Sequence, residues 1–257
     1  MTVFGNYARY YNLLYRDKDY ESEARFVHQL LQTYAPETRS LLELGCGTGV
    51  HAAILAKLGY EVYGVDLSVD MLAEAQKRSQ HLPATLANKL KFAQGDIRTV
   101  RLGQKFDAII SLFHVFSYQT TNHDLQAAFA TAKAHLKPGG LLIFDCWYGP
   151  GVLSDRPTVR VKRLEDAEIT VTRIAEPVIH LNDNLVDVNY QVFIKNRATS
   201  QVEELQETHK MRYLFKPEID YLFSDHEFEF VNYGEWMTGN QPSNNTWNVY
   251  FIGKLRG

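Results

Sequence analysis

Hydrophobic and polar positions follow two periods along the first half of the chain, one typical of buried strands and one typical of amphipathic helices. Short apolar runs predict strands at residues 40–44, 61–65, 90–92, 106–111 and 141–145. Apolar residues three and four positions apart predict helices at residues 20–35, 50–58, 68–78 and 124–136. Because strands and helices alternate, we predict an α/β core with a parallel sheet covered by helices on both faces.

The pattern changes to a period of two from about residue 159 to residue 213. The alternating segments are 169–174, 185–194 and 203–214, separated by Asn182-Asp183-Asn184 and by the polar stretch 195–201. Turn residues between alternating runs indicate an antiparallel sheet. This sheet either covers one edge of the core or serves as a lid over a substrate, and the pattern leaves both roles open.

A last helix at residues 217–223 and two strands at residues 227–233 and 247–255 are expected to return to the first sheet. A chain of 257 residues has room for one large domain with an attached piece. The attached piece is therefore expected to be an internal insert rather than a tail.

The charge balance argues against a nucleic-acid partner. Lys and Arg number 27 against 30 Asp and Glu, so the chain has no excess of positive charge with which to hold a phosphate polymer. The longest apolar stretches are strand-sized, and the charged first twenty residues have no apolar core, so we expect neither a membrane span nor a secretory signal. Two cysteines, Cys46 and Cys146, suit a reducing compartment, and we expect a cytoplasmic location.

A glycine turn, Gly45-Cys46-Gly47-Thr48-Gly49, follows the first predicted strand. Glycine allows the sharp turn and the close approach of backbone to a ligand. Position 50 is Val, so the fingerprint of a nicotinamide dehydrogenase is incomplete. Asp66 ends the second predicted strand, where a carboxylate can accept hydrogen bonds from ribose hydroxyls, and Asp96 follows the third. Together these positions indicate a nucleoside site.

These residues, with the Lys137-Pro138-Gly139-Gly140 turn, resemble the class I S-adenosylmethionine-dependent methyltransferases over roughly residues 40–146. The resemblance implies a doubly wound, mostly parallel seven-stranded sheet of the Rossmann-like methyltransferase fold. Its core is expected at residues 1–150 and 215–257, with an N-terminal helical lid. Residues 151–214 are then an inserted antiparallel β region for acceptor binding or dimerisation.

The implied cofactor is S-adenosylmethionine, and the resemblance assigns each matching residue a part in binding it. Gly45 and Gly47 lie against the methionyl group, Asp66 holds the ribose, Leu67 and Met71 flank the adenine, Asp96 and the Ile97 backbone read its edge, the Leu112 carbonyl faces the ammonium group, and Tyr11 reaches the cofactor. Leu67 and Met71 are also ordinary core residues, and Asp96 also suits a helix cap. Glu43, an acid inside a buried strand, is expected to support the glycine turn.

Segments 7–15, 18–23, 170–173, 186–190 and 207–210 extend the resemblance to the bacterial N,N-dimethyltransferases of nucleotide-linked amino sugars. This family implies a small-molecule acceptor, with Tyr20 and Glu23 in its site. Some members have Gly-His where this chain has Ser117-Tyr118, which leaves the particular sugar open.

The other acceptor-site candidates follow the fourth and fifth predicted strands. Tyr118, Trp147 and Tyr148 are expected to contact the acceptor, because open α/β sheets bind ligands at the carboxyl ends of their strands. His114 and Tyr118 are the candidates for catalysis, although His114 also suits packing. Transfer from an activated sulfonium needs alignment and a dry site, so no metal is expected.

Three further interpretations stay open. The acceptor is a different small molecule with an oxygen or nitrogen nucleophile, or the chain is a cofactor-binding module without catalysis. A nicotinamide dehydrogenase is disfavoured by Val50. A homodimer is compatible with each of these.

Overall fold

The computed structural model describes residues 8–257, apart from the side chains of Ala8, Arg9 and Asn12. Tyr7, the first residue of the N-terminal segment discussed above, lies outside the described residues.

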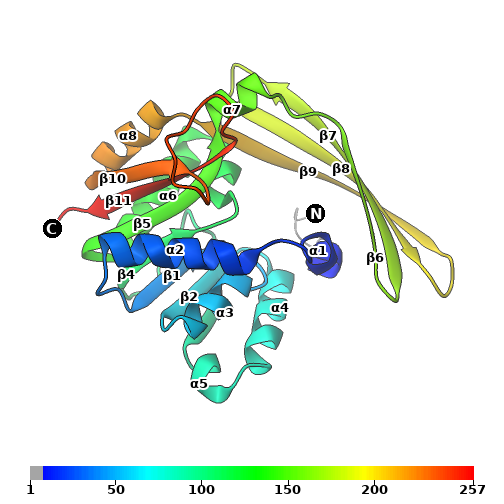
Figure 1. The fold of residues 1–257 in the computed structure, drawn as a ribbon, viewed down its shortest axis with the longest axis horizontal. Helices are drawn as coiled ribbons and strands as arrows, with labels where there is room; N and C mark the ends of the chain where they lie inside the picture. The colour runs from blue at the N-terminus through cyan, green and yellow to red at the C-terminus, as the bar shows by residue number, and fades with distance from the viewer. Residues whose placement is uncertain (1–7) are drawn as a thin grey trace.

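Within these residues, seven strands form the core sheet. Their order is β3 (Leu90–Gln94), β2 (Glu61–Asp66), β1 (Ser40–Leu44), β4 (Phe106–Ser111), β5 (Leu136–Tyr148), β11 (Asn248–Leu255) and β10 (Phe228–Glu235). The first five run parallel, and β11 runs antiparallel to both β5 and β10. The doubly wound, mostly parallel fold predicted from the sequence is thus confirmed (Figure 1).

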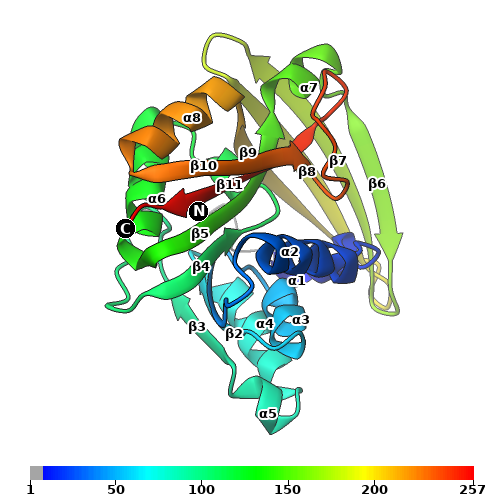
Figure 2. The same cartoon turned by 60° about the vertical axis from the view of Figure 1, so that its left-hand side comes forward.

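The two faces of this sheet pack against different helices, because successive residues of a strand point to opposite sides. Leu42 and Phe144 are buried on one face, and Leu41 and Ile143 on the other. Figure 2 shows the two helical layers on opposite sides of the strands. The first face is covered by α6 (Asn122–His135) and α8 (Lys216–Asp225), and the second by α2 (Tyr20–Tyr34) and α3 (Val50–Lys57).

The helices begin where the sequence offers caps. The Asp19 side chain accepts from the Ser22 N–H at the start of α2, at 2.9 Å. Ser68 accepts from the Met71 N–H at the start of α4 (Val69–Gln80), at 3.3 Å. Such caps satisfy backbone donors that have no partner within the helix. None of the helices in the described part of the chain is long and apolar enough to span a membrane.

Four antiparallel strands lie between β5 and β10 in the sequence and are consecutive in space: β6 (Arg160–Glu165), β7 (Ile169–His180), β8 (Leu185–Asn196) and β9 (Val202–Leu214). The end of β9 runs beside the end of β5, where Trp147 pairs with Tyr213 and Tyr148 with Leu214. On its other edge, Trp147 of β5 pairs with Asn248 of β11. The strand β5 therefore belongs to both sheets, and the long strands extend away from the core (Figure 1).

The N-terminal helix α1 (Ala8–Leu14) lies between the core and this second sheet. Tyr10 and Leu14 are buried with Met71 of α4 and with Val171 and Val192 of β7 and β8. The side chain of Arg16 donates to the Glu165 carbonyl oxygen at 3.2 Å. The helix thus connects two parts of the chain that are distant in sequence.

Two strands and three short helices differ from the sequence prediction. The Lys137–Gly140 segment, predicted as a turn, is the first part of β5, and a Cβ on Gly140 would lie 2.8 Å from the Asp107 carbonyl oxygen. Glycine there allows β5 to begin close beside β4. Strand β6 had no clear alternating signal, because only Val161 and Leu164 of its residues are apolar. The remaining short helices are α5 (Ala84–Ala87), η1 (Val115–Tyr118) and α7 (Gly149–Ser154).

Candidate active site

A cavity of about 480 Å³ lies at the carboxyl ends of the core strands, where ligands bind in open α/β sheets. Its walls come from the core, from the N-terminal segment and from the antiparallel strands. The residues predicted for the cofactor all line it: Tyr11, Gly45, Gly47, Asp66, Leu67, Met71, Asp96, Ile97 and Leu112.

The glycine turn after β1 forms one wall of the cavity. The Gly45 N–H donates to the Val65 carbonyl oxygen at 2.7 Å, which fixes the turn to the end of β2. Gly45 and Gly47 have φ angles of 77° and 53°, a region that glycine adopts without steric cost. A Cβ on Gly47 would meet no atom within 4 Å. The backbone at Gly47 is thus open to close approach by a ligand such as the expected cofactor.

Asp66 connects the end of β2 to this turn. Its Oδ2 accepts from the Gly47 N–H at 2.8 Å, and its Oδ1 accepts from the Ser68 N–H at 2.9 Å. Burial raises the pKa of Asp66 above its ordinary value, and the hydrogen bonds from backbone donors only partly offset this rise. Each carboxylate oxygen has a second lone pair, so the group can also accept from the two hydroxyls of a ribose.

Leu67 and Met71 lie in different environments. The Leu67 side chain lines the cavity and is 53% exposed, so its apolar surface can be covered by a ligand. Met71 is buried and packs with α1. The structure therefore gives Met71 a packing role in addition to its place at the wall.

Asp96, after β3, is paired with Arg98. The Asp96 carboxylate accepts from the Arg98 N–H at 2.9 Å and from the guanidinium Nε at 2.9 Å. The hydrogen bond from the Arg98 side chain lowers the pKa of Asp96. The carboxylate therefore fixes a local turn through Arg98, and both residues line the cavity.

Three predicted acceptor residues, Tyr20, Tyr118 and Trp147, line the same cavity, as does the catalytic candidate His114. The side chains of Tyr20 and Tyr11 are hydrogen-bonded to each other, so a predicted acceptor residue and a predicted cofactor residue are in direct contact. The Lys18 ammonium group lies 4.8 Å from the centre of the Tyr20 ring.

Two predicted acceptor residues, Glu23 and Tyr148, lie outside the cavity wall. Tyr148 follows Trp147 on β5, and successive strand residues point to opposite faces, so it packs instead against the core cluster around α6 and α8. The Glu23 carboxylate instead contacts Lys18 and His51.

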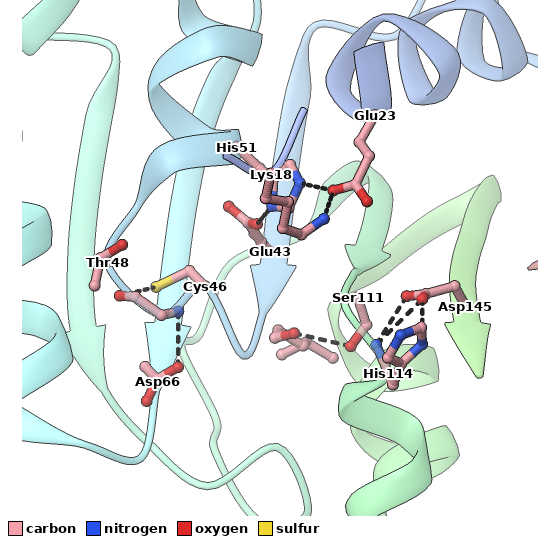
Figure 3. A network of polar contacts seen from close by, with 12 residues as sticks. Lys18, Glu23, Glu43, Cys46, Thr48, His51, Asp66, Ser111, His114 and Asp145 are labelled. Atoms are coloured by element: carbon pink, nitrogen blue, oxygen red, sulfur yellow. Dashed lines mark hydrogen bonds and ion pairs between the residues drawn. The ribbon is translucent and has the colours of Figure 1, made fainter. Parts of the chain in front are cut away.

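Glu23 belongs to a chain of contacts that leads from the N-terminal segment to β1 (Figure 3). Its Oε2 contacts the Lys18 ammonium group and lies 2.8 Å from His51 Nε2. The His51 Nδ1 lies 3.8 Å from Oε1 of Glu43, which is buried in β1. Burial raises the pKa of Glu23, but the His51 hydrogen bond and the Lys18 charge outweigh it and lower the pKa to about 2. Burial raises the pKa of Glu43 to about 8.

His114 is held by a buried carboxylate. The His114 N–H donates to Oδ1 of Asp145 at 3.1 Å, and its ring Nδ1 lies 2.7 Å from Oδ2 (Figure 3). Both Phe113 and His114 have positive φ angles, 66° and 64°, a conformation that costs non-glycine residues free energy and often occurs at functional sites.

Several residues of the cavity wall were not predicted as site residues. They include His51, Arg98, Phe113, Tyr190 and His209. Tyr190 and His209 belong to segments that carried the family resemblance. The period of two also places Val188 with Tyr190, and His209 with Met211, on shared strand faces, and this was the available signal.

Comparisons with known proteins agree with this geometry. A family model described as a methyltransferase domain matches residues 41–140. The dTDP-3-amino-3,4,6-trideoxy-alpha-D-glucopyranose N,N-dimethyltransferase of Streptomyces venezuelae is 37% identical over 190 residues, which cover 73% of this chain and 76% of that protein. The dTDP-3-amino-3,6-dideoxy-alpha-D-glucopyranose N,N-dimethyltransferase of Streptomyces fradiae is 30% identical and covers 78% of this chain and 76% of that protein.

Solved structures give the same result over nearly the whole chain. A S-adenosylmethionine-dependent methyltransferase from Clostridium acetobutylicum has a TM-score of 0.80 at 25% identity, with 96% of each chain covered. Streptomyces venezuelae DesVI has a TM-score of 0.79 at 27% identity, with 98% of each chain covered. The chain therefore belongs to the S-adenosylmethionine-dependent methyltransferases, in the family that includes bacterial dTDP-amino-sugar N,N-dimethyltransferases, and its cofactor is S-adenosylmethionine.

Proposed function

We propose that this enzyme transfers methyl groups to the amine of a nucleotide-linked amino sugar. The relatives at 37% and 30% identity carry names for this reaction on dTDP-linked sugars. The observation that carries the proposal is one cavity lined both by the predicted cofactor residues and by side chains of the N-terminal segment and of β8 and β9. The glycine turn and an enclosing acceptor wall thus face the same space.

On the cofactor side, we assign Gly45, Gly47 and Asp66 to the methionyl and ribose groups. Leu67 and Met71 flank the adenine, Asp96 and Ile97 lie at its edge, and Leu112 and Tyr11 lie toward the reacting end. The sulfonium group of the bound cofactor supplies an activated methyl group, so the protein has to align the acceptor and exclude water.

On the acceptor side, Tyr20, Tyr118 and Trp147 form a largely aromatic wall. Aromatic faces attract cations and also keep water away from the reacting atoms. A sugar amine is a nucleophile only in its neutral form, so this wall must also accommodate the loss of a proton.

Two further parts of the proposal concern the chain as a whole. A cytoplasmic location is supported by Cys46 and Cys146, which are both buried and unpaired. A homodimer would cover the exposed apolar side chains of Val161, Val178 and Val202 in the antiparallel sheet. Sedimentation of the purified protein measures this directly.

The test of the function is incubation with methyl-labelled S-adenosylmethionine and a panel of dTDP- and UDP-linked sugars with the amine at C3 or C4, followed by mass spectrometry. We expect label on the amine of at least one sugar, and none on glycine, which is included because glycine N-methyltransferases are also relatives. Binding of S-adenosylhomocysteine without transfer to any sugar would contradict the proposal. Stabilisation against heat by NAD instead of S-adenosylhomocysteine would also contradict it.

A further inference from the structure

A buried carboxylate on β5 fixes one edge of the His114 ring at the cavity wall. The His114 backbone N–H donates to both oxygens of Asp145, at 3.1 and 3.2 Å. The ring Nδ1 lies 2.7 Å from Asp145 Oδ2, with the ring N–H bent away from the line to that oxygen (Figure 3). The Asp145 side chain is 1% exposed and that of His114 is 16% exposed. The carboxylate therefore holds the ring from its protein side and leaves another edge open.

This contact determines which ring nitrogen can accept a hydrogen bond. A carboxylate only accepts, and two lone pairs 2.7 Å apart would repel each other, so the ring carries its proton on Nδ1. The Nε2 of the neutral ring is then an acceptor. Among the described residues Nε2 has no hydrogen-bond partner, and unlike Nδ1 it is not shielded from solvent. Since His114 lines the cavity, a ligand there can donate to Nε2.

The order of the strands puts His114 on the acceptor side of the cavity. The adenine and ribose are assigned to Asp96 and Asp66, at the ends of β3 and β2, and the methionyl group to the glycine turn after β1. The next strands in the sheet are β4 and β5. His114 follows β4, and its ring centre lies 6.4 Å from that of Trp147 on β5. It therefore lies beyond the methionyl end of the cofactor, beside a predicted acceptor residue.

We propose that His114 Nε2 accepts a hydrogen bond from an N–H of the acceptor amine, which directs the amine lone pair to the methyl group and ends the reaction at the dimethylamine. This inference rests on the proposed function, because the donor of the hydrogen bond is the sugar amine.

The methyl transfer balances with this contact in place. A neutral primary amine donates one N–H to His114 while its lone pair forms the N–CH₃ bond. The C–S bond breaks, and its electrons remain on the neutral thioether sulfur. Positive charge thus passes from sulfur to nitrogen, so the hydrogen bond to Nε2 strengthens as the transition state is approached. The ammonium product then releases one proton to water, which restores a lone pair for the second transfer.

The same contact distinguishes the stages of methylation. The secondary amine left by the first transfer still has one N–H for Nε2 and one lone pair for the methyl group. A neutral dimethylamine has a lone pair but no N–H, and its protonated form has an N–H but no lone pair. Only the first two amines can therefore be held and react at the same time.

His114→Asn removes the acceptor with little change to the loop. Its carboxamide N–H can keep the Asp145 contact near the place of Nδ1, but nothing replaces Nε2. Asparagine also tolerates the positive φ of 64° at this position. With the sugar that the wild-type enzyme methylates, we expect kcat to fall roughly 100-fold, as when one hydrogen bond made in the transition state is lost. His114→Gln, whose carboxamide oxygen reaches the place of Nε2, should recover part of this loss.

All rates are measured above the pKa of the amine, so that the amine is neutral with every variant and its own ionisation does not contribute. The control is His123→Asn, because His123 is an exposed histidine on α6 outside the cavity wall. Its kcat should equal that of the wild-type enzyme. Equal losses of kcat in His114→Asn and His114→Gln would show that Nε2 is not the group required and would overturn the inference.

Binding measurements test the proposed limit on methylation. In the presence of S-adenosylhomocysteine, the wild-type protein should bind the N-methyl form of the sugar about tenfold more tightly than the N,N-dimethyl form, because only the former donates to Nε2. His114→Asn should bind the two forms with nearly equal affinity. The same preference in both proteins would show that the space around the amine, and not His114, separates the two forms, and would overturn the inference.

The ring can also be observed without turnover. Nitrogen-15 NMR of the complex with S-adenosylhomocysteine should show His114 with its proton on Nδ1 and an unprotonated Nε2 that shifts when the amino sugar is added. A proton on Nε2 would overturn the inference. So would an unchanged acceptor affinity in His114→Asn with a large loss of S-adenosylhomocysteine affinity, because Nε2 would then contact the cofactor.

The two proposals fail in different ways. Absence of turnover by the wild-type enzyme on every amino sugar overturns the proposed function and the inference that rests on it. Normal turnover by His114→Asn on a sugar that the wild-type enzyme methylates overturns the inference alone.

Discussion

The backbone N–H of Gly47 donates a hydrogen bond to Oδ2 of Asp66 at 2.8 Å, so the glycine turn and the end of β2 are joined directly at the cofactor site. Asp66→Ala removes this bond and the proposed acceptor of the ribose hydroxyls. We expect the binding of S-adenosylhomocysteine to weaken by about 1–3 kcal/mol, as is usual when hydrogen bonds to a charged group are lost. Titration calorimetry measures this change.

Asp70→Ala is the matched control, because Asp70 is an exposed acid in the first turn of α4. Its S-adenosylhomocysteine affinity should equal that of the wild-type protein. Equal affinity in Asp66→Ala as well would remove Asp66 from the cofactor site.

Substitutions of two neighbouring glycines should have different effects. A Cβ on Gly45 would lie 2.5 Å from the Val115 side chain, so Gly45→Ala should lower the thermal stability of the protein. A Cβ on Gly47 meets no protein atom within 4 Å but occupies the cavity side of the turn, so Gly47→Ala should mainly weaken cofactor binding.

Gly103→Ala separates backbone strain from occupation of the site. Gly103 has a φ angle of 68°, with no atom within 4 Å of an added Cβ, and it lies away from the cavity. The positive φ angle should lower the free energy of unfolding by about 1 kcal/mol in both Gly103→Ala and Gly47→Ala. Retention of full cofactor affinity in Gly47→Ala would show that the ligand does not approach this backbone.

The buried Glu43 should make the stability of the protein depend on pH. Its pKa is raised from an ordinary value of 4.5 to about 8, so the folded protein keeps a proton that the unfolded chain releases. Stability should therefore fall as the pH rises from 4.5 through about 8. Glu43→Gln removes this titration, and denaturant unfolding at several pH values should show a flatter profile. Glu61→Gln, at an exposed position on β2, should leave the wild-type slope unchanged.

Glu23→Gln should disturb the acceptor more than the cofactor. The Glu23 carboxylate contacts Lys18 and His51, and the Tyr20 ring lies 5.0 Å from the His51 ring. Loss of the Glu23 charge should therefore loosen the packing that holds the Tyr20 side chain in position. We expect roughly tenfold weaker acceptor binding, corresponding to about 1.4 kcal/mol, and a smaller change for S-adenosylhomocysteine. Separate titrations of the two ligands distinguish these effects.

The lowered pKa of Glu23 gives this contact a pH dependence of the opposite sign to that of Glu43. Its stabilising contribution is present above pH 4.5 and is lost as the pH falls through about 2. Glu21→Gln, at an exposed position on the same helix, is the control for the measurements on Glu23→Gln. A larger loss of cofactor affinity than of acceptor affinity in Glu23→Gln would contradict this account.

The sequence was most informative where a function depends on neighbouring residues. The glycine turn follows β1, Asp66 ends β2 and Asp96 comes two residues after β3, and the parallel order of the strands brings these ends together. The start of α4 was also predictable, because a serine directly before an apolar-periodic segment favours an N-cap and Ser68 caps this helix.

Contacts between distant segments could not be predicted in the same way. Tyr118 and His209 are 91 positions apart, and their hydrogen bond depends on how β9 packs against η1. Likewise, Trp147 and Tyr148 are both aromatic and adjacent in sequence, but on strand β5 their side chains point to opposite faces of the sheet. Such relationships arise from packing and register, which a single sequence does not specify.

The sharing of β5 between two sheets has a consequence for how this enzyme can diversify. Among the described residues, the antiparallel sheet pairs with β5 at Trp147 with Tyr213 and at Tyr148 with Leu214, while the glycine turn and Asp66 lie on the core side of that boundary. A change in the length or surface of the distant end of that sheet would leave the glycine turn and Asp66 in place, whereas a change where it packs with Tyr11 and Met71 would reach the cofactor residues as well. The acceptor specificity and the methyl donor site can therefore change at different positions of the chain.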